Sequence, residues 1–301
     1  MILILLSFTF LLGDIDPTLE EAITALERNA AKFSHGHAKY TVEKRNYGSE
    51  KIRESLKAES YFSGNHYAWE KGDWRYVWTP EQVISYFSGG RRVPKSPEEA
   101  RNGNSVFINS PLQSGDKPWM YSPNTLSLTT MLSNDAPPRS IGADIRKALE
   151  PGIQVVLTQM VDERLMVTIA FSKEQIAQDT RFAHAKNVYL LDPACGYMPV
   201  VIERWGRPDG PYQRYMSSFK QIDGDIWVAE KVVRETWRTE NDGRWQQPTY
   251  TIKLDEIDLQ TKPEESTFTV DWIAPPVGTR IQDRIDDTET QFGVEDTEQK
   301  N

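Results

Sequence analysis

The chain has 301 residues, enough for one large β domain or two smaller ones, and a core of that size needs no metal or disulfide to hold it. The formal charge of −9 lies mostly near the C-terminus, because residues 283–301 carry seven acids and two bases while the rest of the chain is close to neutral. This balance argues against nucleic acid and against electrostatic docking on an anionic membrane, and the single cysteine, Cys195, excludes an intramolecular disulfide.

The amino terminus, residues 1–13, is almost wholly apolar. It is too short to cross a bilayer as a helix, and its length fits the apolar region of a secretory signal peptide. No Lys or Arg precedes the apolar run, and Leu11 is a poor residue two positions before Gly13, so the segment departs from the usual signal pattern. We expect a signal peptide or hydrophobic leader on an exported, periplasmic protein. An uncleaved anchor or a hydrophobic first strand is the alternative.

A single amphipathic helix is predicted next, over residues 17–33. Asp16 is a suitable N-cap, Pro17 fits the first turn, and Thr18 with Glu21 forms a capping box. The apolar residues recur at helical spacing on one stripe: Leu19, Ala22, Ile23, Leu26, Ala30 and Phe33. Such a stripe needs a surface to pack on.

From Gly36 onward apolar residues alternate with polar ones, which is the period of a half-buried strand. Successive short strands are separated by turns at Gly48, Gly64 and Gly72, and a further strand is predicted at residues 83–87. Antiparallel strands that follow one another in this way form a meander.

The middle of the chain interrupts the strand pattern. Residues 89–111 are rich in Arg and Pro, and we expect a surface excursion there. Residues 112–152 are interpreted as short helices and loops that form a lid over one sheet face. Ser140 caps a predicted helix that ends at the Pro-Gly pair of residues 151–152. The large apolar residues of the lid include Leu128, Met131, Leu132, Ile145 and Leu149.

Strand character then returns. The clearest signal is a long hairpin within residues 212–237, because the Asp223-Gly224 pair between alternating apolar residues favours a tight type I′ turn. A second hairpin is predicted about Asp162-Glu163. Further strands are predicted at residues 187–191, 200–205, 250–257 and 268–272. Residues 285–301 are acidic, rich in Thr and poor in large apolar residues, so we expect a disordered tail.

Patterns for catalysis or metal binding are scarce. His35 and His37 form an HxH pair of the kind that zinc enzymes use, but no third ligand motif supports it, and we assign no metal site. The sequence shows no nucleophile elbow and no phosphate loop, so we predict no catalytic residue and no cofactor. Glu59 and Glu70 lie on neighbouring aromatic strands, where two acids across a cleft would suit a carbohydrate-active enzyme, the third of our hypotheses.

The aromatic strands have two interpretations. Their Tyr and Trp side chains either form ordinary core beneath the helices or line a cavity for an apolar ligand, since aromatic and Met-containing walls are typical of such pockets. The candidate cavity residues are Trp69, Trp74, Tyr76, Trp78, Leu128, Met131, Leu132, Ile145 and Leu149.

Taken in order, these elements resemble the LolA-like family, which includes the lipoprotein carriers of the bacterial periplasm and related sensor domains. The likeness begins with the export-like start, the lone helix before the first strand and the helical segment inserted near the middle. It continues in three late motifs: F-K-Q-I-D-G-D-I-W at residues 219–227, Y-x-I-x-L at 250–254, and Phe268 followed by P-P-x-G-T at 275–279. Together they cover residues 17–283.

The resemblance implies an α+β fold in which a large antiparallel sheet of about eleven strands curls into an incomplete barrel. The N-terminal helix and the mid-chain lid would cover its concave face, and residues 14–284 would form a single LolA-like domain. The implied function is to bind a lipid or the acyl chain of a lipoprotein without catalysis, as a monomer, in the manner of outer-membrane lipoprotein sorting. The alternative is a periplasmic sensor or scaffold that binds a membrane-associated protein partner on the same fold.

Overall fold

The computed structural model describes residues 17–72, 74–87, 105–110, 129–130, 139–152, 154–240 and 243–293. The α-helices in these ranges are α1 (Pro17–Ala31), α4 (Ile141–Ala148), α5 (Lys173–Gln178) and α6 (Val270–Ile273), and η4 (Glu265–Phe268) is a 3-10 helix. The strands before α4 are β1 (His35–Arg45), β2 (Ile52–Ser63), β3 (His66–Lys71), β4 (Trp74–Trp78), β5 (Val83–Phe87), β6 (Val106–Asn109), β7 (Thr129–Thr130) and β8 (Arg139–Ser140). The strands after α4 are β9 (Gln154–Val161), β10 (Arg164–Phe171), β11 (Lys186–Asp192), β12 (Met198–Arg207), β13 (Gly210–Ile222), β14 (Ile226–Glu240), β15 (Gly243–Gln246), β16 (Thr249–Asp258), β17 (Arg280–Asp283) and β18 (Thr288–Gln291). The predicted leader, residues 1–13, lies outside the described residues.

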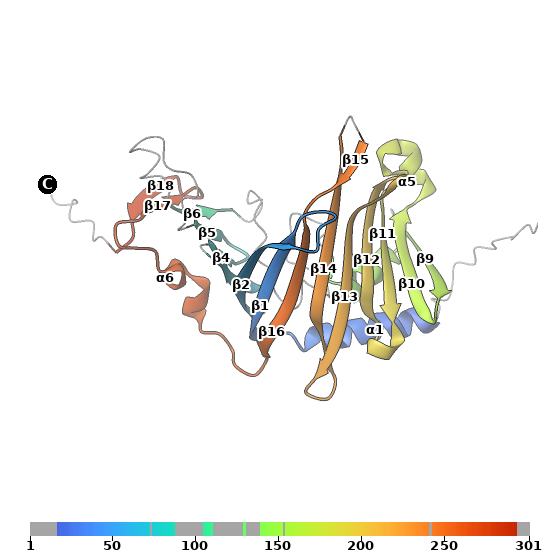
Figure 1. Ribbon diagram of the computed structural model, residues 1–301, viewed down its shortest axis with the longest axis horizontal. Coiled ribbons are helices and arrows are strands. Elements are labelled where there is room, and N and C mark those ends of the chain that lie inside the picture. Colours follow the sequence, from blue (N-terminus) through green and yellow to red (C-terminus); the bar gives the residue numbers. More distant parts are fainter. Residues whose placement is uncertain are drawn as a thin grey trace, which may run out of the picture.

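One sheet of 16 strands dominates the molecule (Figure 1). Its strand order is β18-β17-β6-β5-β4-β3-β2-β1-β16-β14-β13-β12-β11-β10-β9, with β15 paired to β14. Its described pairs are antiparallel except β6 with β17, which run parallel. The predicted α+β class with a large antiparallel sheet is therefore confirmed. With 16 strands, the sheet is wider than the predicted sheet of about eleven strands. Part of the difference is that β6, β17 and β18 extend one end.

Three segments differ from the sequence prediction. The surface excursion predicted at residues 89–111 contains β6, whose Val106, Phe107 and Ile108 supply the apolar run that a strand requires. The predicted tail contains β18, a Thr-containing strand that pairs with β17, so residues 288–291 are ordered. The strand predicted at residues 268–272 is instead the end of η4 followed by α6, which ends at Ala274 with φ of 45°.

The two predicted hairpins are confirmed. Val161 pairs with Arg164 across a two-residue loop whose residues, Asp162 and Glu163, both have positive φ, as a type I′ turn requires. In the longer hairpin Ile222 pairs with Ile226, so the loop has one residue more than a type I′ hairpin loop, although Asp223 and Gly224 again have positive φ. Local turn chemistry thus located both hairpins.

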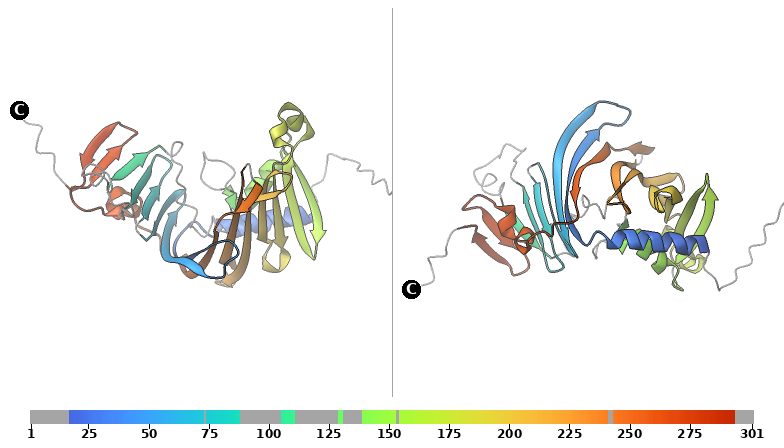
Figure 2. Two further views of the ribbon diagram at one scale, coloured as in Figure 1. Left: turned by 45° about the horizontal axis from the view of Figure 1, so that its top comes forward. Right: turned by 90° about the horizontal axis from the view of Figure 1, so that it is seen from below.

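The sheet is strongly curved and does not close into a barrel. Viewed from below, the strands form an arch, and α1 lies across its open side (Figure 2). The predicted helix is confirmed as α1, and the predicted Ser140 cap is confirmed by the Ala143 amide, which donates to Ser140 Oγ over 3.1 Å at the start of α4. Both helices therefore cover the concave face, as the fold prediction requires.

The two helices approach each other closely. A Cβ at Gly142 of α4 would lie 2.9 Å from the carbonyl oxygen of Ile23 on α1, so only glycine fits this crossing without movement. At the surface, Arg146 of α4 donates over 3.0 Å to both Glu20 and Glu27 of α1. The two ion pairs raise the pKa of Arg146 and hold the helices as one cover.

Two hydrophobic clusters lie on opposite faces of the sheet. The larger, which we call the concave-face core, joins α1 and α4 to the strands; its buried members include Leu19, Ile23, Leu26, Tyr40, Phe62, Trp78, Ile141, Ile145, Val167, Tyr189 and Leu191. The smaller, the outer cluster, joins η4 and α6 to β3–β6 and consists of Ala68, Val77, Ile84, Tyr86, Val106, Phe268 and Ile273. Strand alternation, which sends successive side chains to opposite faces, allows one strand such as β3 to supply both clusters.

Candidate functional site

The four predicted aromatic residues lie on one face of two neighbouring strands. β3 and β4 pair so that Trp69 lies opposite Tyr76 and Tyr67 lies opposite Trp78. Because residues two apart on a strand share a face, Trp74, Tyr76 and Trp78 lie on the same side as Trp69. Trp78 is part of the concave-face core, which places all four residues on the concave face.

Three of these rings form a stack. The ring centroids of Trp69 and Tyr76 are 4.6 Å apart with an interplanar angle of 24°, and those of Trp74 and Tyr76 are 5.9 Å apart at 4°. Trp69 and Tyr76 are buried, whereas Trp74 at the end of the stack is 43% exposed. Solvent exposure of the stack is therefore greatest at Trp74.

The helical part of the predicted wall comes from α4. Ile145 is fully buried in the concave-face core together with Trp78, and the partly buried Leu149 packs against that core. The structure thus brings Trp78, Ile145 and Leu149 into one apolar cluster on the face that carries the aromatic stack. Three further candidates, Leu128, Met131 and Leu132, lie outside the described residues.

One buried polar residue fixes where α1 lies on the sheet. Asn29 is 4% exposed, and its amide exchanges two hydrogen bonds with the backbone of Trp227, donating over 2.9 Å and accepting over 2.8 Å. These bonds attach α1 beside the β13–β14 turn. The sequence prediction missed Asn29. The signal available was that this asparagine lies next to Ala30, a residue of the apolar stripe of the helix.

Sequence reasoning also missed a set of basic residues on the concave face. Lys44 follows the core residue Val42 by two positions on β1, and Arg234 follows the core residue Val232 by two positions on β14. This even spacing puts both cations on the core-facing side of their strands, and it is the signal that was available in the sequence.

The acids considered for carbohydrate chemistry lie on the opposite, outer face. Glu59 and Glu70 are cross-strand partners of β2 and β3. Glu59 Oε2 lies 3.1 Å from His37 Nε2 and accepts a 3.0 Å hydrogen bond from the Tyr61 hydroxyl, while Glu70 accepts from Arg75 over 3.1 Å. Both carboxylates are thus engaged on the side of the sheet away from the concave-face core.

His37 of the HxH pair lies beside these acids on the outer face. His37 stacks on Tyr61 with ring centroids 4.4 Å apart. Burial and the neighbouring Glu59 carboxylate raise the pKa of Tyr61 to about 12. In the part of the chain that the structure describes, no group of three or more His, Cys, Asp or Glu side chains is placed to hold a metal ion.

Cys195 lies in a short turn beside the concave-face core. It packs partly buried against that core, and burial together with the charge of Asp192 raises the pKa of its thiol. A raised pKa keeps the thiol protonated and weakly nucleophilic. The environment of Cys195 therefore suits a small, partly buried apolar side chain.

A small hollow lies at the β12–β13 turn. It is formed by residues 206, 207 and 209–212 together with Trp237 and has a volume of about 250 Å³. Tyr212, at its wall, is 47% exposed. The hollow holds none of the predicted wall residues.

Comparison with known proteins identifies structural neighbours. No protein-family profile matches the sequence, and no curated protein matches it. A domain from Vibrio parahaemolyticus named for outer membrane lipoprotein sorting is 14% identical, with 85% of this chain and 99% of that chain covered and a TM-score of 0.42. A LolA superfamily protein from Nitrosomonas europaea is 10% identical, with 84% and 99% covered and a TM-score of 0.45. A DUF1329 family protein from Desulfovibrio piger is 12% identical, with 86% and 99% covered and a TM-score of 0.41.

The chain is thus similar to LolA-superfamily and lipoprotein-sorting structures over most of its length, at low identity. Among the helices of the described residues, none is long and apolar enough to cross a membrane.

Proposed function

We propose that the protein is an exported, non-enzymatic binding protein that holds a lipid, or the acyl chain of a lipoprotein, between the concave face of its sheet and the helices α1 and α4. One observation carries this proposal: the sheet is curved but left open, and helices rather than a second sheet lie across its apolar and aromatic concave face. The ordered motifs that resemble the LolA-like family support the same function.

The chemistry of such a ligand fits the residues present. Each methylene that moves from water into an apolar site contributes about 0.8 kcal/mol, so an acyl chain of about a dozen methylenes gains roughly 10 kcal/mol before the cost of immobilisation. Binding of this kind needs apolar area and a cover that can move. It needs no nucleophile, acid–base pair or metal.

We assign the wall of the site to the predicted residues on this face. Trp74 would present its exposed ring to the ligand, and Trp78, Ile145 and Leu149 would form the apolar floor beneath α4. The α1–α4 pair would act as the lid, since its contact includes surface ion pairs that can exchange with water at small cost.

A second candidate function is that of a periplasmic sensor or scaffold that binds a protein partner. The observation that favours it is the edge strand β9, which within the described residues pairs only with β10. Leu157 and Met160 on this strand are 51% and 54% exposed. An edge strand with exposed apolar side chains can accept a strand from a partner.

Native mass spectrometry of the full chain after gentle extraction tests the lipid proposal. We expect wild type to carry an adduct with the mass of a lipid, and Trp74→Ala to retain less of it, because the variant removes an aromatic ring from the proposed wall. Leu157→Ala, at an equally exposed site on β9, is the matched control and should retain the adduct. A chain that carries no lipid and takes none up from lipid micelles would contradict the proposal.

A further inference from the structure

Cationic and aromatic side chains alternate across five adjacent strands on the concave face. The row, which we call the cationic ladder, consists of Lys44 (β1), Tyr250 (β16), Arg234 (β14), Tyr215 (β13) and Arg204 (β12). The first four are cross-strand partners, and the fifth, Arg204, lies one face position further along β12, opposite Gln213. Lys44 Nζ lies 5.6 Å and Arg234 Cζ lies 4.7 Å from the ring centroid of Tyr250. Tyr215 is the cross-strand partner of Arg234, and Arg204 Cζ lies 5.6 Å from its ring centroid.

The ladder borders the concave-face core directly. Val42, Ile252 and Val232 form the preceding row on the three central strands, and they are 3%, 7% and 1% exposed. Two residues along a strand span roughly 7 Å, so the charged groups lie within one side-chain length of the apolar floor. A surface with these two zones side by side suits a molecule that has a charged end and an apolar end.

The three cations of the ladder are not in ion pairs. Within the described residues, Lys44, Arg204 and Arg234 form no ion pair, although Glu54 is the cross-strand neighbour of Lys44. Arg204 is only 7% exposed, and it donates to the side-chain oxygen of Gln213 over 3.2 Å. Holding a guanidinium out of water without a counter-anion is costly, and a bound anion would offset that cost.

Hydrogen-bond donors next to the ladder are also unsatisfied. Arg234 Nε, the Tyr215 hydroxyl and the Ser217 hydroxyl are buried and have no hydrogen-bond partner among the described residues. Arg234 and Tyr215 are cross-strand partners, and Ser217 lies two residues beyond Tyr215 on the same face of β13. Buried donors without acceptors are uncommon in folded proteins, and three in one place fit the oxygens of a ligand.

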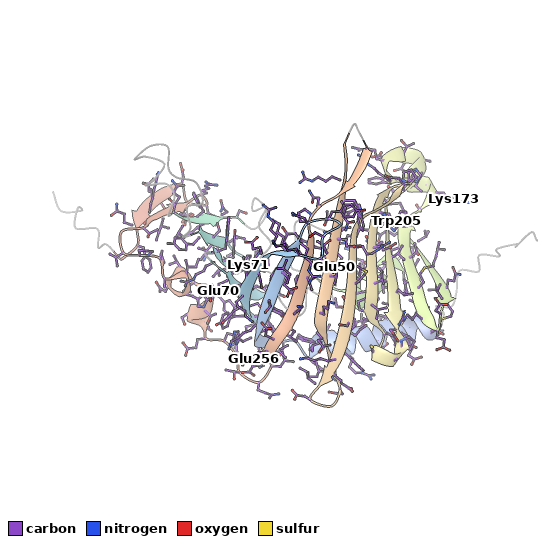
Figure 3. All side chains as sticks on the ribbon, in the orientation of Figure 1. Glu50, Glu70, Lys71, Lys173, Trp205 and Glu256 are labelled. Atoms are coloured by element: carbon purple, nitrogen blue, oxygen red, sulfur yellow. The ribbon has the colours of Figure 1, made fainter. Side chains whose placement is uncertain are left out.

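Lys71 adds a further positive charge to this region. It lies on β3 next to Glu70, and both residues are labelled in Figure 3. Because side chains alternate along a strand, Lys71 lies on the same face as the core residue Tyr67, and Glu70 lies on the other face. Burial lowers the pKa of Lys71, and the charges of Arg234 and Lys44 lower it further, whereas Tyr250 and Glu54 raise it. Glu54, opposite Lys44 on β2, is the carboxylate among these groups. Three cations thus meet one acid inside a protein whose net charge is −9.

We propose that the cationic ladder binds the anionic headgroup, a phosphate or a carboxylate, of an amphiphile whose acyl chain lies on the concave-face core. The inference rests on the proposed function and adds to it the chemical class of the headgroup. Guanidinium groups match the paired oxygens of phosphate and carboxylate, and a tyrosine or serine hydroxyl donates to the oxygens that remain. Binding of this kind weakens as salt screens the charges.

The test measures binding of two short-chain lipids to the full chain: phosphatidylglycerol, whose headgroup is a net anion, and phosphatidylcholine, whose headgroup phosphate is balanced by the choline cation. The ladder variant is Lys44→Gln with Arg234→Gln, which removes two cations that form no ion pair and should leave the thermal midpoint unchanged. The control variant is Lys39→Gln with Lys57→Gln on the outer face, where the two lysines pair with Glu256 over 2.8 Å and Asp255 over 3.0 Å.

We expect wild type and the control variant to bind phosphatidylglycerol about tenfold more tightly than phosphatidylcholine, which is the typical effect of one charged hydrogen bond. The ladder variant should bind both lipids equally. Equal binding of the two lipids by wild type, or a preference that persists in the ladder variant, overturns the headgroup assignment and leaves the proposed function standing.

Inorganic phosphate alone is the third arm and separates the two proposals. If neither lipid binds, the proposed function fails. If, in that case, phosphate binds to wild type but not to the ladder variant, the ladder is an anion site without an amphiphile, and the inference as stated is overturned. If phosphate competes with phosphatidylglycerol in wild type and not in the ladder variant, the headgroup assignment is supported.

Discussion

The two ends of the sheet are covered on opposite faces. In the part of the sheet that runs in the order β1-β16-β14-β13-β12-β11-β10-β9, the helices α1 and α4 lie over the concave face. On strands β3–β6, the short helices η4 and α6 lie on the outer face. The short α6 buries Ile273 in the outer cluster, and Arg75 of β4 donates to the carbonyl oxygen of this residue. α1 instead crosses the arch and is attached through Asn29 and two ion pairs of α4.

The difference shows that the two helical covers pack against different partners. α1 and α4 bury the large concave-face core, whereas η4 and α6 bury the small outer cluster on strands β3–β6. Under the proposed function, the α1–α4 cover is the one that would have to move for a ligand to enter.

The largest expected effects come from truncating one buried residue in each region. Leu26→Ala in α1 and Ile273→Ala in α6 remove side chains that are 1% and 0% exposed, and such changes cost about 2–5 kcal/mol. We expect Leu26→Ala near the upper end of this range, because its neighbours are buried on all sides, and Ile273→Ala near the lower end, because the small outer cluster can collapse. Urea denaturation measures both. A larger loss for Ile273→Ala would reverse the ranking of the two regions.

The second prediction concerns the helix crossing. Replacing glycine by alanine inside a helix normally stabilises by roughly 1 kcal/mol. At Gly142 the added methyl would meet the Ile23 carbonyl at 2.9 Å, so we expect Gly142→Ala to destabilise by about 1–3 kcal/mol instead. Lys147→Ala on the exposed side of α4 is the control and should change the thermal midpoint little. Stabilisation by Gly142→Ala would show that the two helices are not in close contact.

A smaller effect is expected from the ion pairs between the helices. Arg146 is 44% exposed and pairs with Glu20 and Glu27, so Arg146→Gln should cost no more than about 1 kcal/mol at low salt. The loss should disappear in roughly 1 M salt, where exposed charges are screened. Denaturation at the two salt concentrations checks this, and an effect that is independent of salt would point to packing rather than charge.

The smallest effect on stability at neutral pH is expected for Tyr61, which packs against the outer cluster. The pKa of Tyr61 is raised to about 12 in the folded protein, chiefly by burial and then by Glu59. Because the folded state favours the protonated phenol, this contribution to stability is complete below a pH of about 10 and is lost as the pH rises towards 12. Tyr61→Phe should therefore make the alkaline loss of stability shallower. Thermal midpoints from pH 7 to 12 measure it, and an unchanged profile would contradict the assignment.

The sequence by itself determined the elements whose signals are local. Helical periodicity and a capping box located α1, Ser140 marked the start of α4, and turn residues with positive φ located the hairpins at Asp162 and Asp223. The face of the aromatic residues on β3 and β4 also followed from strand alternation. In each case the residues that decide the structure lie within a few positions of one another.

Only the tertiary structure decided how distant segments meet. The parallel pairing of Ile281 with Val106 joins a late strand to an early one, and no local pattern encodes a partner 175 positions away. The register of the ladder depends on two bulges, opposite Lys39-Tyr40 and opposite Ser218-Phe219, where β16 and β14 each carry one extra residue. Even spacing from a core residue places Lys44 and Arg234 on the core-facing side of their strands, but the aromatic and charged neighbours that surround them are supplied by strands that the sequence places far away.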